Sequence, residues 1–189
     1  MTRISCIVAA VTLLHVASGT ASASVQLTVN FDLWQRAAGN TTKLDFVFDT
    51  PQVITDQYSA LGVLFPDGDD YVAPVSVPPP GSDGWFLRDT WGDLQTTFVF
   101  DDLQTAIGFT AGIGHFFSLY SGDTLVYESP EFGTNPFIGA ISTIPFDRVV
   151  MSRSGGGPAV DTFWFGGTVP APGTIAVLAL AFVGSRRRR

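Results

Sequence analysis

Apolar and polar residues alternate along several segments in the middle of the chain. The apolar positions that share one face are Ile107/Phe109/Ala111/Ile113, Phe117/Leu119, Leu125/Tyr127 and Val149/Met151. A period of two with one apolar face is typical of strands in two sheets that pack face to face. Residues 25–167 contain no long segment with the helical period of 3.6, so this part of the chain is predicted to be all-β.

Turn-forming Gly, Pro, Asn and Asp residues divide this region into short runs rich in Phe, Val, Ile and Thr. The spacing predicts strands at residues 26–31, 43–48, 58–65, 71–77, 94–100, 106–113, 115–120, 124–128, 138–142, 148–152 and 160–165. Pro74 cannot donate to a sheet ladder, so the strand that contains it is expected at a sheet edge. The pattern favours a jelly-roll-like antiparallel β-sandwich over residues 24–168, with helices only in the two terminal segments.

Residues 1–23 have the pattern of a secretory signal peptide. Arg3 supplies the positive charge, residues 4–16 form the apolar region, and Ala21 and Ala23 are the small residues before a cleavage site. Signal peptidase is therefore an expected partner of an exported chain. The only cysteine, Cys6, lies within this segment, so the mature protein is expected to have no disulfide.

Residues 169–189 contain three features in succession. The motif Val169-Pro170-Ala171-Pro172-Gly173 is followed by an unbroken apolar run over residues 175–183, and the chain ends in Arg186, Arg187, Arg188 and Arg189. The run is shorter than the roughly 20 residues of a membrane span, but arginine side chains can reach the headgroups and extend it. Terminal arginines favour a cytoplasmic C-terminus, with the short hydrophobic helix in the inner membrane.

This order of motif, hydrophobic helix and arginine cluster resembles the PEP-CTERM sorting signal of exported bacterial proteins. In that family a membrane protease, exosortase, cuts near a Pro-Glu-Pro-like motif, and Ala171 stands here at the position of the glutamate. The resemblance implies a membrane-anchored intermediate that is then sorted to the cell surface or to the extracellular space. It also associates the chain with exopolysaccharide and the biofilm matrix.

A second, shorter resemblance concerns the body of the chain. Gln57-Tyr58, followed by Gly62-Val63 and then Phe65, is similar to a segment found in exported proteins that carry this sorting tail. Residues 45–49, 106–109 and 159–166 occupy the corresponding earlier and later positions. Those proteins look like carbohydrate-binding-type β-sandwiches, so the resemblance supports the predicted fold.

The charge of the body excludes one class of partner. Residues 32–161 hold all 17 acidic residues, whereas five of the ten basic residues lie at the ends, which leaves the body at 5 − 17 = −12. A surface with this charge repels phosphate backbones, so nucleic acid is not an expected partner.

The chemistry-bearing residues do not form a recognisable catalytic set. His115 is the only histidine outside the signal segment, and no Gly-x-Ser-x-Gly or P-loop motif occurs. A glycoside hydrolase needs two carboxylates that flank the bond, and the two glutamates, Glu128 and Glu131, have the pattern of a solvated turn. We therefore expect no enzymatic activity; a secreted glycan hydrolase built on an Asp pair is the less favoured alternative.

Calcium is the only cofactor that the sequence suggests. Asp67, Asp69 and Asp70 place three carboxylates in one tight turn, and calcium is bound by such oxygens; an Asp-rich turn without a metal explains the same pattern. Asp49 and Asp161 form a second candidate set, because they adjoin strands that resemble the early and last strands of the related sandwiches.

Sugar binding is the second functional hypothesis. Trp85 and Trp91 lie among acidic residues and an arginine, and a flat ring beside polar groups suits a polyol surface. The alternative is that both rings cap the sandwich core, where Trp34 and Trp164 are also expected. The sequence thus favours a non-catalytic surface or matrix protein, with a lectin-like module that binds extracellular polysaccharide as the alternative.

Overall fold

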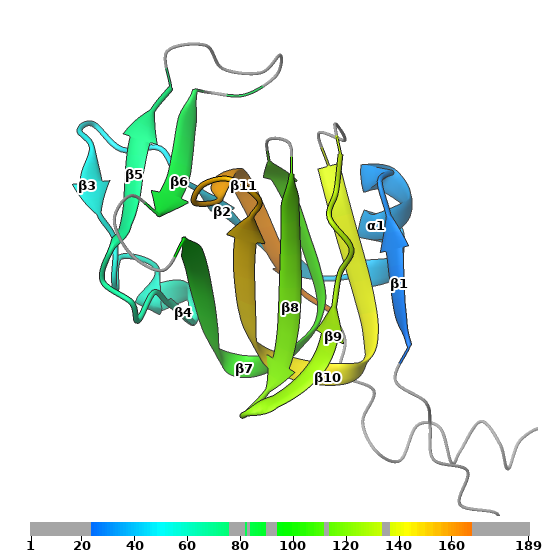
Figure 1. Ribbon diagram of the computed structural model, residues 1–189. Coiled ribbons are helices and arrows are strands. Elements are labelled where there is room, and N and C mark those ends of the chain that lie inside the picture. Colours follow the sequence, from blue (N-terminus) through cyan, green and yellow to red (C-terminus); the bar gives the residue numbers. More distant parts are fainter. Residues whose placement is uncertain are drawn as a thin grey trace, which may run out of the picture.

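The computed structural model describes residues 24–75, 82, 84–89, 94–111, 114–133 and 137–167. Its elements in chain order are β1 (Val25–Thr28), α1 (Phe31–Ala38), β2 (Thr41–Asp45), β3 (Gln52–Val53), the 3-10 helix η1 (Ser59–Leu61), β4 (Val63–Leu64), β5 (Asp70–Pro74), β6 (Trp85–Asp89), β7 (Gln95–Ala111), β8 (His115–Ser121), β9 (Thr124–Glu128), β10 (Phe137–Arg153) and β11 (Ala159–Gly166). All of the strand pairs are antiparallel, which confirms the predicted all-β class (Figure 1).

Two long strands, β7 and β10, build both layers of a sandwich. Each contributes one half to a layer with β2, β11 and β1 and the other half to a layer with β4, β8 and β9. Both strands curl at one end of the molecule, where their register shifts (Figure 1). The shift in β10 includes Pro145, which has no N–H to donate, and the shift in β7 lies near Asp101 and Asp102.

The core lies between the two layers and is rich in phenylalanine. The rings of Phe98 and Phe163 stack at 4.1 Å between centroids, and Phe109 meets Phe117 edge to face at 5.7 Å. Most residues predicted to face inward are completely buried, among them Ile107. Burial of this apolar area is the main stabilisation of the sandwich.

The alternation predicted for strand 124–128 is wrong at one position. Leu125 is 50% exposed, although Tyr127 packs against the core as expected. The cause is a register shift between β8 and β9: Leu119 is opposite Tyr127, but the next residue, Tyr120, is opposite Leu125. An extra residue in one strand reverses the face on which the following side chains lie.

The sequence also predicted strand where the structure has helix. Residues 26–31 were expected to be one strand, but α1 begins at Phe31 and covers the outer face of one layer (Figure 1). The Asn30 side chain caps the helix by accepting a hydrogen bond from the Leu33 N–H at 3.0 Å. Gly39, with a φ of 74°, ends the helix and donates its N–H to the carbonyl of Gln35.

Trp34 anchors this helix to the sheet. It is completely buried against Phe137 and Ala106, and it lies over Gly108 and Gly139, which are opposite each other on β7 and β10. A Cβ atom at Gly139 would lie 2.4 Å from Cδ1 of Trp34. The two glycines therefore make the recess in which the indole sits.

Other differences concern the remaining strands. Predicted strands 94–100 and 106–113 belong to the single strand β7, and strands 138–142 and 148–152 belong to β10. The prediction of an edge strand at Pro74 is wrong, because β5 lies between β3 and β6. Pro74 is tolerated because β3 pairs only with Tyr71 and Val72. Residues 58–65 form η1 and the two-residue strand β4 instead of one long strand.

Candidate functional site

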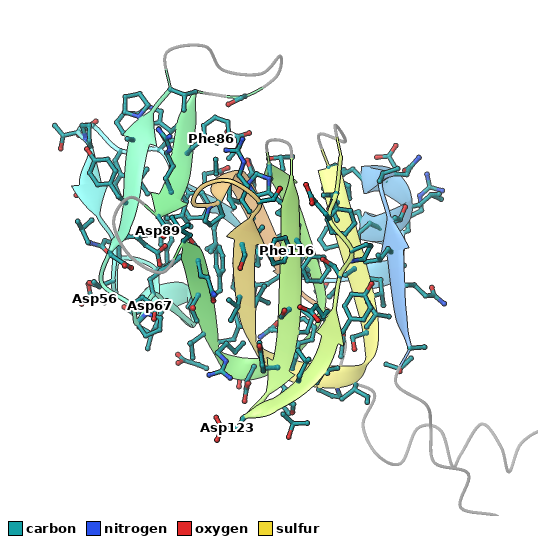
Figure 2. The ribbon with its side chains drawn as sticks, in the orientation of Figure 1. Asp56, Asp67, Phe86, Asp89, Phe116 and Asp123 are labelled. Atoms are coloured by element: carbon teal, nitrogen blue, oxygen red, sulfur yellow. The ribbon has the colours of Figure 1, made fainter. Side chains whose placement is uncertain are left out.

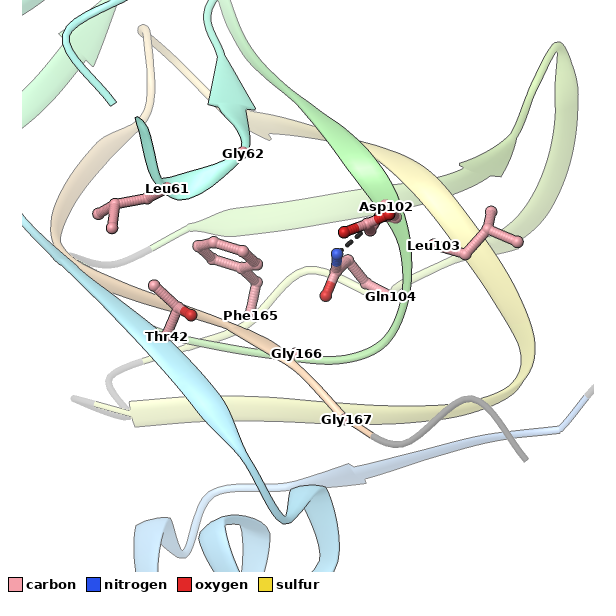
Figure 3. Close-up of a pocket in the computed structure, with 9 residues that line it drawn as sticks. All are labelled: Thr42, Leu61, Gly62, Asp102, Leu103, Gln104, Phe165, Gly166 and Gly167. Carbon is pink, nitrogen blue, oxygen red and sulfur yellow. Dashed lines mark hydrogen bonds between the residues drawn. The ribbon is translucent and has the colours of Figure 1, made fainter. Parts of the chain in front are cut away.

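A pocket of about 300 Å³ opens where the bend of β7 meets the end of β11 (Figure 3). Its lining comes from β2, the turn after η1, the bend of β7 and the end of β11, and consists of Thr42, Leu61, Gly62, Asp102, Leu103, Gln104, Phe165, Gly166 and Gly167. We call this set the bend pocket. The volume lies at the lower end of the range of small-molecule sites, which is about 300–1,000 Å³.

One polar group of the bend pocket, the amide of Gln104, is fixed by the fold. Gln104 is 7% exposed, and its Nε2 donates a hydrogen bond of 2.6 Å to the backbone carbonyl of Asp102 (Figure 3). This bond orients the amide and leaves the Gln104 oxygen as an acceptor and the second N–H as a donor. The exposed carboxylate of Asp102 and the hydroxyl of Thr42 complete a small set of hydrogen-bonding side chains.

Apolar groups line the rest of the bend pocket. Phe165 is 5% exposed, and its ring lies 5.0 Å from the ring of Phe100 between centroids, so it is held firmly by the core. Leu61 and Leu103, which are 47% and 49% exposed, provide apolar surface at the rim. The pocket thus combines apolar surface with a few polar groups, an arrangement common in sites for small polar ligands.

A second group of polar residues lies where β5 begins and β6 ends. Asp70 and Asp89 are directly opposite each other in the sheet and are 0% and 6% exposed. Asp67 and Asp69 precede β5 in the turn, and Figure 2 shows Asp67 and Asp89 at the same end of this strand pair. We call Asp67, Asp69, Asp70 and Asp89 the acidic cluster.

Asp70 is the most constrained member of the acidic cluster. Its Oδ1 accepts a hydrogen bond of 2.7 Å from the hydroxyl of Thr96, whereas its Oδ2 is buried with no hydrogen-bond partner. The pKa of Asp70 is raised to about 7, mainly by burial; the Thr96 hydrogen bond opposes this rise, and the charges of Asp67, Asp69 and Asp89 add to it. Asp70 is therefore close to half protonated at neutral pH.

The sequence placed candidate calcium ligands at Asp67, Asp69 and Asp70. The structure brings these three residues together and adds Asp89, which sequence reasoning did not select. Within the described part of the chain, no three His, Cys, Asp or Glu side chains are arranged to hold a metal ion. Calcium binding by the acidic cluster stays a prediction.

Asp49 and Asp161, the second candidate set of calcium ligands, have different surroundings in the structure. Asp161 accepts hydrogen bonds from the hydroxyls of Ser82 at 2.9 Å and Thr110 at 3.2 Å, one on each carboxylate oxygen. Asp49 is exposed in the segment after β2. The contacts of Asp161 give it a structural role, in which it links β11 to β7 and to Ser82.

Of the two tryptophans predicted to bind sugar, the structure describes only Trp85. Trp85 begins β6, is partly buried and packs against the main core, which matches the core-capping alternative. Trp91 lies outside the described residues. Trp34 and Trp164 pack together on the outer face of the sheet, as core or end-packing residues.

His115 is a structural residue of the sandwich. It is completely buried at the start of β8, and its Nε2 accepts a hydrogen bond of 2.8 Å from the N–H of Ala159. This bond ties β8 to the start of β11.

The signals predicted from the sequence at the two termini lie outside the described residues. These are the signal peptide at 1–23, the sorting motif at 169–173 and the arginines at 186–189. No helix within the described ranges has the length and apolar character to cross a membrane.

Sequence reasoning missed the bend pocket because its lining comes from four distant segments. Two signals mark it in retrospect. Asp101-Asp102 interrupts the apolar alternation between two predicted strands, and Gly166-Gly167 follows the last predicted strand. Neither signal identifies Thr42, Gln104 or Phe165 as neighbours, because only the folded sheet brings them together.

Comparisons with known proteins find only a distant similarity to two solved structures. No protein-family model matches the chain, and no curated protein matches its sequence. A solved mutant of a family 29 carbohydrate-binding module, made to probe ligand recognition, has a TM-score of 0.33 and 10% identity over 68% of this chain and 89% of that one. Another family 29 carbohydrate-binding module has a TM-score of 0.32 and 12% identity over 68% and 87%. At these scores the likeness assigns neither a ligand nor a site to this chain.

Proposed function

We propose that this chain is an exported, non-catalytic β-sandwich that binds carbohydrate in the bend pocket. The observation that carries the proposal is the lining of this pocket. Phe165 contributes apolar lining for the C–H groups of a sugar, while Gln104, Asp102 and Thr42 can form hydrogen bonds with its hydroxyls. The pocket volume of about 300 Å³ suits one sugar unit and not a long chain segment.

The groups in the bend pocket are suited to binding and not to bond cleavage. Asp102 is the single carboxylate among the described lining residues, whereas hydrolysis of a glycosidic bond requires a pair. Gln104 does not ionise, so it can orient a ligand but cannot transfer a proton. These features support the binding role over the hydrolase alternative.

A glycan-array screen of the purified chain tests this proposal. The variant Gln104→Ala removes the amide acceptor, and Gln26→Ala, an exposed residue of β1, is the matched control. We expect at least one glycan to bind, with binding weakened by about fivefold in Gln104→Ala and unchanged in Gln26→Ala, since one hydrogen bond contributes about 1 kcal/mol. Glycan binding that both variants retain in full would place the site elsewhere on the molecule.

We also propose that the C-terminal segment directs the protein to the cell surface or the extracellular space. The support is the order of the Val-Pro-Ala-Pro-Gly motif, the apolar run and the terminal arginines. Deletion of residues 186–189 removes the positive charges that favour a cytoplasmic C-terminus, so we expect the uncut form to accumulate. Fractionation and immunoblotting of the deletion strain measure this, and unchanged processing and location would contradict the role of the arginines.

A further inference from the structure

We propose that the bend pocket selects glycans that contain a positively charged amino sugar over glycans that are neutral or acidic. This inference rests on the proposed carbohydrate binding and adds the chemical class of the ligand. It follows from the charges and hydrogen-bonding groups that surround the pocket.

The charges beside the bend pocket are negative. Asp102 lines it, and the carboxylate of Asp101 lies beside Gly62: a Cβ atom at Gly62 would be 3.8 Å from Oδ2 of Asp101. The Asp101 N–H also donates to the Gly62 carbonyl at 3.0 Å, which fixes the two segments together. The lining residues that the structure describes include no Lys, Arg or His.

The basic residue nearest in sequence does not offset these charges. Lys43 follows the lining residue Thr42 on β2, but successive side chains of a strand point to opposite faces. Lys43 is paired with Asp45 at 2.5 Å and lies 6.0 Å from the centre of the Trp164 ring. The pocket therefore keeps its negative charge, within a body of net charge −12 (5 − 17).

The hydrogen-bonding groups favour a ligand that is rich in donors. Asp102 offers acceptors only, and Gln104, which donates one amide N–H to the Asp102 carbonyl, offers its oxygen and its second N–H. An ammonium group has three donors and no acceptor, so it complements these oxygens better than a carboxylate or sulfate does.

The test measures binding of three oligosaccharides by titration calorimetry at mildly acidic pH, where an amine is protonated and an ordinary Asp is ionised. The probes are oligomers of glucosamine, of N-acetylglucosamine and of galacturonic acid, which carry positive, no and negative charge. Asp102→Asn removes the charge and keeps the shape of the side chain. Asp123→Asn, on the exposed turn between β8 and β9, is the matched control (Figure 2).

We expect the glucosamine oligomer to bind about tenfold more tightly than the acetylated oligomer, and the uronic acid oligomer to bind most weakly. Asp102→Asn should weaken this preference, because only the Asp101 carboxylate then remains beside the pocket, while Asp123→Asn should leave it intact. Equal binding of the charged and acetylated oligomers would overturn the inference and leave the carbohydrate proposal standing. Equal losses in both variants would show diffuse attraction to the acidic body and also overturn it. Binding to none of these probes, nor to any glycan on the array, would reject the carbohydrate proposal itself.

Discussion

Replacement of Asp70 by Asn tests whether a buried carboxylate makes the fold sensitive to pH. Asp70 is completely buried, and its pKa is raised from 3.8 to about 7 in the folded state, so the folded chain holds a proton that the unfolded chain releases. Stability linked to this group is fully present below about pH 4 and is lost as the pH rises through 7. A difference of 7 − 3.8 = 3.2 pKa units corresponds to about 4 kcal/mol at most.

The assay is urea denaturation at about pH 5 and at about pH 8, with a chelator present. Unfolding is monitored by tryptophan fluorescence. Asn has the shape of the protonated side chain and cannot ionise. We therefore expect Asp70→Asn to be about 2–4 kcal/mol more stable than the natural chain at the higher pH, with a much smaller difference at the lower pH. Asp123→Asn should show no such gain. If Asp70→Asn is less stable than the natural chain at about pH 8, the reasoning that the buried charge of Asp70 destabilises the fold is refuted.

Three further outcomes follow from named contacts. Gly139→Ala places a methyl group against Trp34 and should destabilise the protein by about 1–3 kcal/mol in urea denaturation, whereas Gly133→Ala, with nothing within 4 Å of the new Cβ, should be neutral. His115→Ala leaves the N–H of Ala159 without its acceptor and should cost about 1–3 kcal/mol in the same assay; a loss below 0.5 kcal/mol would show that water replaces the bond. If the acidic cluster binds calcium, a chelator should lower the melting temperature measured by circular dichroism, and an unchanged melting curve would remove the metal from the account.

The sequence predicts the class of fold well because alternation is a local property. Phe117/Leu119 and Val149/Met151 face the core as their spacing indicates. The continuity of β7 and β10 could not be read in this way, because Asp101 and Pro145 look like turn signals. In the folded chain they mark bends where each strand passes from one layer to the other.

Helix α1 shows a second limit of local reasoning. Its eight residues are too few to establish a helical period, and Phe31 extends an apparently strand-like run. What stabilises α1 is the contact of Trp34 with two glycines from strands more than 70 residues away (108 − 34 = 74). The bend pocket has the same origin, since Thr42, Gln104 and Phe165 become neighbours only when β2, β7 and β11 are aligned.

The most direct test of the central claim is titration of the purified chain and of Gln104→Ala with the glycan that binds best on the array. The account predicts saturable binding to the natural chain that is weakened by about fivefold in Gln104→Ala, with no change in Gln26→Ala. Equal affinity of all three proteins for that glycan would contradict the assignment of the bend pocket as the carbohydrate site.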